Sequence, residues 1–131
     1  MNLEALRAYC LSLPFATEDI KWESELTFCV GGKIFAMASL NPGRNGTVCF
    51  KVTPEDFVSL IECDGIVPAP YVARYHWILI ENPDAMKPAE LKRRLAESHA
   101  RVLDALPRKI RLEMGIPEKQ KSEKTPKKPR K

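Results

Sequence analysis

The sequence predicts an α+β domain built on an antiparallel β-sheet, and three features carry that prediction. Two apolar runs are separated by Gly31-Gly32, a pair typical of a hairpin turn because both central residues need positive φ. A third alternating run, 47–52, follows a segment dense in turn formers at 41–46. Segments with helical spacing of apolar residues, 3–13 and 88–106, flank these strands in the sequence.

The first half of the chain predicts one helix and three strands. Asn2 is suited to cap a helix whose apolar residues share one face until Pro14 prevents continuation. A polar loop is expected over residues 17–19. The strands then follow as an antiparallel meander, with alternating apolar and polar residues at 26–30, 33–40 and 47–52.

The second half predicts two helices and one more strand. Thr53 offers a capping hydroxyl and Pro54 a first helical residue that needs no N–H, so a helix is expected to about Cys63. Two prolines favour an ordered but irregular crossing over residues 66–75. A last strand is expected over 76–81, and the longest helix over 88–107.

The length of 131 residues and the hydrophobic content of 44% suit one core. We expect one domain over 1–110 and a basic, Lys- and Pro-rich tail over 111–131 that is mostly disordered. Apolar residues can extend the packing a little past residue 108, namely Ile110, Leu112, Met114 and Ile116, whereas 117–131 lacks the apolar side chains that would offset the entropy of ordering.

The charge is divided unevenly between the predicted domain and the tail. Residues 108–131 hold ten Lys or Arg and three Glu, a balance of +7, whereas residues 1–107 hold eleven basic and fourteen acidic residues, a balance of −3. Nearly all of the positive charge therefore belongs to the C-terminal segment. A binding site for polyanions on the folded part has to rest on a few local side chains.

No motif in the sequence specifies a reaction, so we expect no enzyme, no cofactor and no metal site. Four widely spaced cysteines form no CxxC pair and are expected to be buried or half-buried reduced thiols. HExxH, P-loop, GxGxxG, GxSxG and EF-hand patterns are absent from the sequence. His99 lies on the apolar stripe of the last helix, either as a core histidine bonded to backbone or as a buried titratable group.

Basic side chains next to predicted turns are candidates for contact with nucleic acid. Lys33 follows the Gly-Gly turn, Arg44 lies in the 41–46 loop, and Arg74 with Tyr75 precedes the last strand. Lys92-Arg93-Arg94 is interleaved with acidic residues and is interpreted as a solvated helix face. The tail suits a basic arm that attracts polyanions through counterion release, through Lys119, Lys121, Lys124, Lys127, Lys128, Arg130 and Lys131.

A second hypothesis is a non-catalytic module that binds a protein or a small ligand. Its groove would be lined by Tyr71, Arg74, Tyr75 and His76. His76 precedes Trp77 at the start of a strand, so their side chains point to opposite faces. Trp77 is expected in the core, and His76 toward solvent or a groove.

The ordered residues resemble the MmcQ/YjbR family. The resemblance spans about residues 1–110, and its most specific part is Pro68-Ala69-Pro70-Tyr71 followed by His76-Trp77. Other matching pieces are Cys10 to Pro14, Ala16 to Asp19, Trp22, Phe28 to Ala36, Lys51 to Phe57, Gly65 to Val67, and Ser98-His99 running on to Leu106-Pro107.

The resemblance implies a CyaY-like (frataxin-like) two-layer sandwich with helices packed on one face of the sheet, in the order αβββαβα. It also implies DNA binding through paired β wings. From the charge of the tail, we expect any such binding to be largely without sequence specificity. Iron handling, a second implication of the shared fold, is opposed by the first helix, which holds only Glu4 and Arg7 as charged residues. We further expect a cytoplasmic monomer without a membrane segment, since no apolar stretch approaches about 20 residues.

Overall fold

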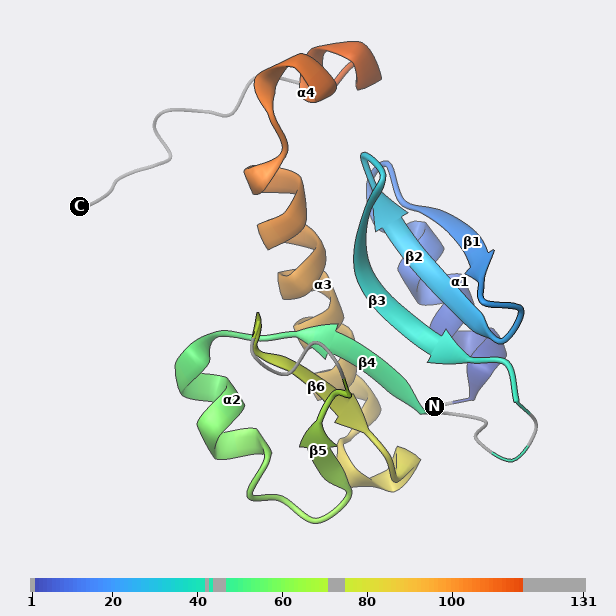
Figure 1. Cartoon of the computed structure of the whole chain (residues 1–131), viewed down its shortest axis with the longest axis vertical. Helices are drawn as coiled ribbons and strands as arrows, with labels where there is room; N and C mark the ends of the chain where they lie inside the picture. The colour runs from blue at the N-terminus through green and yellow to red at the C-terminus, as the bar shows by residue number, and fades with distance from the viewer. Residues whose placement is uncertain (1, 42, 44–46, 71–74, 117–131) are drawn as a thin grey trace.

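The computed structural model describes residues 2–41, 43, 47–70 and 75–116. The strands form a single sheet, and helices pack on it (Figure 1). In chain order the elements are α1 (Leu3–Ser12), β1 (Thr17–Lys21), β2 (Glu25–Val30), β3 (Lys33–Ser39), β4 (Val48–Lys51), α2 (Pro54–Leu60), β5 (Ile66–Pro68), β6 (Trp77–Ile80), the 3₁₀ turn η3 (Pro83–Ala85), α3 (Pro88–Ala105) and α4 (Arg108–Met114).

The predicted α+β class with an antiparallel sheet is confirmed. Among the described residues, six strands pair antiparallel in the order β1-β2-β3-β4-β6-β5. Helices α1 and α3 lie behind the sheet in Figure 1, and α2 lies beside β5 and β6. The observed order departs from αβββαβα because the described chain contains two further strands and a further helix.

The loop expected at residues 17–19 is wrong, because Thr17–Lys21 forms the edge strand β1. It pairs with β2 from Thr17↔Cys29 to Lys21↔Glu25. An edge strand meets solvent along one side, so β1 can be polar and shows no apolar alternation. The pairing with β2, not the sequence of β1 itself, makes this segment extended.

The irregular crossing expected over 66–75 contains the short edge strand β5. Ile66 is buried and pairs with Ile80, and the strand ends at Pro68, a residue that sheets accept mainly at their edges. Helix α2 ends at Leu60, three residues before the predicted Cys63, and a turn connects it to β5.

The predicted core position of Trp77 is wrong. Ile78 and Ile80 fill the core face of β6, with at most 1% of their surface exposed. Side chains alternate along a strand, so Trp77 and Leu79 face away from the helices and are half-buried.

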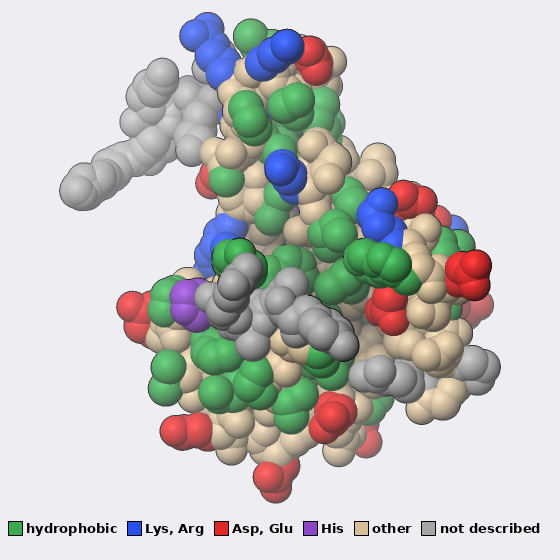
Figure 2. Space-filling model, in the orientation of Figure 1, with side chains coloured by type: hydrophobic (Ala, Val, Ile, Leu, Met, Phe, Trp, Pro, Cys, Tyr) green, Lys and Arg blue, Asp and Glu red, His purple; other side chains and the backbone are tan. Residues whose placement is uncertain are grey.

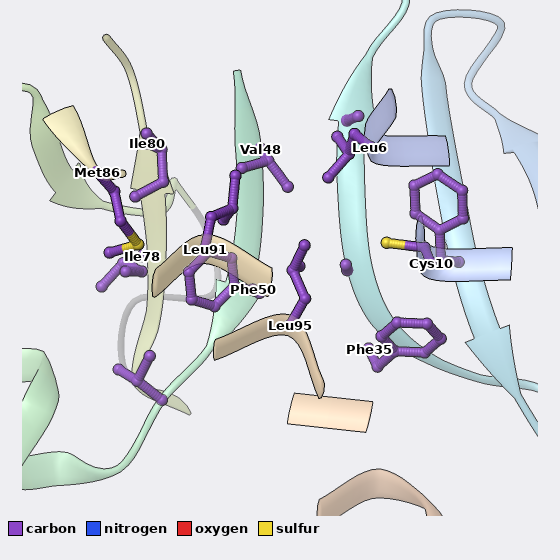
Figure 3. Close-up of a cluster of buried hydrophobic side chains, with 14 of the residues drawn as sticks. Leu6, Cys10, Phe35, Val48, Phe50, Ile78, Ile80, Met86, Leu91 and Leu95 are labelled. Atoms are coloured by element: carbon purple, nitrogen blue, oxygen red, sulfur yellow. The ribbon is translucent and has the colours of Figure 1, made fainter. Parts of the chain in front are cut away.

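The core lies between the sheet and the helices α1 and α3. Its largest fully buried side chains include Phe28, Phe35 and Phe50 from three adjacent strands, and Figure 3 shows Phe35 and Phe50 with Leu6 and Leu95 of the helices. The β2–β3 register shifts at Phe28/Cys29, which makes Phe35 the extra residue of a bulge. The backbone oxygen of Phe35 accepts a hydrogen bond from Ser98 Oγ on α3 at 2.8 Å.

His99 is a core histidine bonded to backbone, one of the two interpretations that the sequence left open. It is 4% exposed, and its Nε2 donates to the Pro14 carbonyl oxygen over 2.7 Å. Its ring meets the Phe35 ring edge-on, with centroids 5.1 Å apart. His99 therefore ties α3 to the link between α1 and β1.

The packed part of the chain continues past the boundary expected at residue 110. Helix α4 ends at Met114, and its C-cap Gly115 adopts the left-handed conformation (φ 75°) that glycine accepts readily. The next residue, Ile116, is buried in the core. Ile110 and Met114 pack against the same core, whereas Leu112 is 58% exposed.

Ion pairs cover the outer face of α3, as its interleaved charges predicted. Arg93 contacts Glu90 and Glu97, and Arg94 Nε donates to Glu90 at 3.2 Å. Arg94 also reaches across to α2, where its Nη1 donates to Asp56 Oδ2 at 2.8 Å. This hydrogen bond holds the pKa of Asp56 below its usual range.

Replacing Ile116 tests whether the folded unit extends past residue 110. We expect Ile116→Ala to lower the free energy of unfolding by about 2 kcal/mol or more, because it leaves a void in the core. Leu112→Ala, an exposed position on the same segment, should change it by less than about 0.5 kcal/mol. Urea unfolding of the full chain measures both, and equally small decreases would place the end of the packed unit before Ile116.

Replacing Asp56 tests the link between α2 and α3. Because its pKa is lowered in the folded protein, the carboxylate stabilises the fold above the unfolded pKa of about 3.9, and this contribution is lost as the pH falls through the folded pKa. Asp56→Asn should therefore cost up to about 1 kcal/mol at pH 7, and the difference from wild type should shrink below about pH 4.

Glu55→Gln is the matched control for Asp56→Asn. It removes the same charge from the first turn of α2 without removing the hydrogen bond to Arg94. Urea unfolding across a pH series should show a larger decrease in stability for Asp56→Asn. Equal decreases would assign the effect to the charge near the helix N-terminus and not to Arg94.

Candidate nucleic-acid interface

Lys33 is the one described member of the predicted set of nucleic-acid contacts. It is exposed and begins β3, directly after the Gly31-Gly32 turn at the tip of the β2–β3 hairpin. Both glycines have positive φ, at 60° and 81°, as predicted for this turn. The other members lie outside the described residues: Arg44, Arg74, Lys119, Lys121, Lys124, Lys127, Lys128, Arg130 and Lys131.

The tip of the β2–β3 hairpin packs against the junction between α3 and α4. A Cβ atom added to Gly31 would lie 2.7 Å from Leu106 Cδ1 and 3.3 Å from Ile110 Cγ2. Only glycine fits this approach without a shift of its neighbours. The packing brings Lys33 to the same end of the molecule as α4.

Helix α4 adds basic residues to this end. Arg108 and Lys109 are exposed in its first turn, and Arg111 Nη1 donates to the Leu103 carbonyl oxygen at 2.8 Å. In Figure 2, basic side chains gather at the upper end of the molecule, where Figure 1 draws α4. We define the basic end as Lys33, Arg108, Lys109 and Arg111.

Three of the four residues of the basic end were not singled out from the sequence. Their only sequence signal was the rise in positive charge from residue 108 onward. Lys33 precedes Arg108 by 75 positions, so no local pattern connects them. The packing of Gly31 against Leu106 and Ile110 brings them together.

The basic residues of α3 are engaged within the protein. Arg93 and Arg94 make the ion pairs described above, and Arg101 lies 4.0 Å from Glu97. The Lys92 ammonium lies 5.6 Å from the centre of the Tyr9 ring, a cation–π distance. This face of α3 is therefore a network of internal contacts, as its charge pattern indicated.

Two acidic residues, Glu23 and Glu25, lie at the other end of the β1–β2–β3 layer, in and beside the β1–β2 turn. Residues 1–26 hold five acidic and two basic side chains, which accounts for the whole balance of −3 in residues 1–107. The β1–β2 turn at 22–24 lies a full strand length from Gly31-Gly32, about 20 Å for the six residues of β2. The two charge signs are therefore separated along the sheet.

The groove of the second hypothesis is described only in part. Tyr71 and Arg74 lie outside the described residues, and Tyr75 is 50% exposed. His76 is half-buried with a positive φ of 68°, and its ring meets Phe57 of α2 edge-on at 5.6 Å. The structure thus places His76 against α2, and the groove itself stays a prediction.

Three of the four cysteines are buried in the described part of the chain. Cys10, Cys29 and Cys49 are buried, as expected, but the prediction is wrong for Cys63, which is exposed in the turn after α2. Burial raises the pKa of Cys10 and of Cys49 to about 12, which disfavours the reactive thiolate. Within these residues, no group of three or more His, Cys, Asp or Glu is placed to hold a metal ion.

The acidic side chains nearest the first helix are paired with bases. Arg7 Nε donates to Glu18 Oε1 at 2.7 Å, and Lys21 Nζ donates to Asp19 Oδ2 at 3.1 Å. These pairs turn two of the carboxylates toward neighbouring cations.

The described helices include none that is both long and apolar enough to cross a bilayer.

Comparison with known proteins identifies the family. A crystal structure of a Deinococcus radiodurans protein, DR2400, described as a DUF419 domain, is similar with a TM-score of 0.74 and 24% identity over 94% of each chain. A Pseudomonas syringae protein is similar with a TM-score of 0.64 and 22% identity, over 78% of this chain and 99% of that one. At these identities the likeness shows the fold alone.

Sequence comparison goes further than the structural likeness. No curated protein sequence matches the chain. The sequence model of the YjbR family matches residues 11–101, well over half of the chain. This protein therefore belongs to the YjbR family.

Proposed function

We propose that this protein binds nucleic acid through its basic end and the tail that follows it, largely without sequence preference and without catalysis. One observation carries the proposal. The β2–β3 hairpin tip with Lys33 packs at the start of α4, and the segment that holds seven further Lys or Arg begins one turn beyond α4. In the sequence, the basic arm thus follows directly on the folded basic end.

The physical basis of such binding is neutralisation of phosphates. Each Lys or Arg that binds a phosphate releases condensed counterions, which gives affinity without reading the base sequence. Lys33 is exposed on the hairpin tip and Lys109 is exposed on α4, so the phosphate backbone of a nucleic acid can reach both. Glu23 and Glu25 lie at the far end of β2, so repulsion there would turn the basic end toward the polyanion.

The remaining predictions fit this proposal without being tested by the described residues. Arg44 and Arg74 lie outside the described residues and stay predictions of the paired-wing arrangement, separate from the basic end. A cytoplasmic monomer is the form of the protein that we propose to act. The alternative groove near Tyr75 and His76 remains a second hypothesis.

A salt series with short duplex DNA tests the contribution of the folded basic end. The slope of log K against log salt should become shallower by about 1 for each phosphate that a variant no longer neutralises, so Lys33→Ala and Lys109→Ala should each reduce it by about that amount. Lys87→Ala is the matched control, because Lys87 is an exposed lysine preceding the N-terminus of α3. Unchanged slopes in both variants would show that the folded domain makes no phosphate contacts through these two lysines, and would refute its part in the proposed binding surface.

A tail variant separates the contribution of the arm. In the full chain, the seven basic residues beyond residue 117 are replaced by Gln, which removes charge and keeps length. The variant should bind duplex DNA far more weakly at 50–200 mM salt, a range over which about six phosphate contacts change affinity roughly 10³-fold. Complete absence of binding at low salt would assign the function to the tail alone, and unchanged binding would refute the proposal.

A further inference from the structure

Two large apolar side chains are exposed together on the β1–β2 hairpin, at the acidic end of the sheet. Trp22 is 71% exposed and Ile20 58% exposed. Trp22 lies in the turn, and Ile20 lies two residues earlier on the edge strand β1. Aromatic residues of this kind are enriched where proteins bind other proteins.

The backbone holds Trp22 in this exposed position at a cost. Trp22 and Glu23 have φ values of 54° and 64°, a conformation that bulky residues adopt rarely. The turn is fixed by the pairing of Lys21 with Glu25 and by a hydrogen bond from Leu40 N–H to the Ser24 carbonyl oxygen at 2.8 Å. Such strain is found more often at binding sites than elsewhere.

A pocket of about 500 Å³ adjoins this hairpin. It opens between α1 and the strands, and its apolar lining comes from Leu3, Ile20, Leu26 and Leu40. The charged part of the lining consists of Glu4, Arg7, Glu18 and Asp19. An ion pair between Arg7 and Glu18 bridges α1 and β1 at this pocket. A pocket of this size accepts one large side chain with room for its neighbours.

The charge around the pocket favours a cationic partner. Residues 1–26 carry a balance of −3, and both of their basic side chains, Arg7 and Lys21, are already paired with carboxylates of the same region. Glu4 lines the pocket and Glu23 lies beside Trp22. Like charge would repel nucleic acid from this surface.

The edge of β1 is partly closed to strand addition. Ile20 N–H donates to Asp19 Oδ1 at 2.8 Å, so this backbone donor is satisfied by its own neighbour. Recognition by side chains is therefore favoured over extension of the sheet. The sequence beyond Ile116 is basic but contains no apolar side chain other than proline, so it lacks the apolar anchor that the pocket would take.

We propose that this surface, made of the pocket and Trp22, binds an extended segment of a partner protein in which an apolar side chain lies between Lys or Arg residues. The apolar side chain enters the pocket and packs toward Trp22. The basic residues on either side face Glu4 and Glu23. Trp22 lies at the opposite end of the β2 strand from Lys33, so its contact with the partner is separate from the proposed nucleic-acid binding.

Titration of the ¹⁵N-labelled full chain with synthetic peptides tests the proposal. The probe is a nine-residue peptide of alternating Lys and Leu, and its two matched controls replace Leu by Ser or Lys by Glu. The Lys-Leu peptide should shift the amide signals of 3–7, 18–26 and 40, and both controls should bind at least about tenfold more weakly. Shifts centred elsewhere would overturn the assignment of the surface.

Variants of the protein complete the test. Trp22→Ala should weaken binding of the Lys-Leu peptide about tenfold or more, whereas Val58→Ala, at an apolar residue of α2 that is 60% exposed, should leave its affinity unchanged. Equal affinity of Trp22→Ala and wild type would refute the proposal. So would equally tight binding of a peptide of sequence 117–131, which lacks the apolar anchor.

The two proposals fail separately. Trp22→Ala should bind duplex DNA as wild type does, because Trp22 lies at the acidic end. A parallel decrease of DNA binding and peptide binding in this variant would show that one surface serves both, and would overturn the inference of a separate protein site.

Discussion

Helix α3 lies against the middle of the sheet, and the arrangement of every other element depends on that packing. Leu91 and Leu95 fill the space over β4, as Figure 3 shows for Leu95 beside Phe50. One turn further, Ser98 and His99 satisfy backbone oxygens of Phe35 and Pro14. Apolar burial places the helix, and these two hydrogen bonds fix its register against both the β3 bulge and the end of α1.

The same helix sets the distribution of charge. Its 18 residues span about 27 Å and carry the chain from the β6 side of the sheet to the tip of the β2–β3 hairpin. Leu106 and Ile110 then pack at Gly31, which leaves the basic first turn of α4 at that tip. The acidic turn of β1–β2 is held at the other end of the same strands. Packing of neutral residues thus separates the charges.

The interior and the surface of this fold differ in what their side chains do. Inside, His99, Cys10 and Cys49 are used for packing, since burial removes the accessibility and the ionised thiol that chemistry would need. Outside, hairpin turns carry the features that suit binding: Lys33 at one tip and Trp22 at another. A rigid scaffold that presents its turns is a common arrangement for binding proteins.

Local signals in the sequence determined the elements whose ends are fixed by neighbouring residues. Asn2 caps α1, Thr53 and Pro54 begin α2, and Gly31-Gly32 makes the hairpin turn, because each of these interactions spans only two to four residues. The tertiary structure decided what depends on distant partners. Strand β1 is extended because it pairs with β2. Trp77 faces outward because Ile78 and Ile80 fill the core face of β6. Lys33 lies near α4 because Gly31, which has no side chain, packs closely against Leu106. These outcomes arise from packing between residues up to 75 positions apart, which no local pattern encodes.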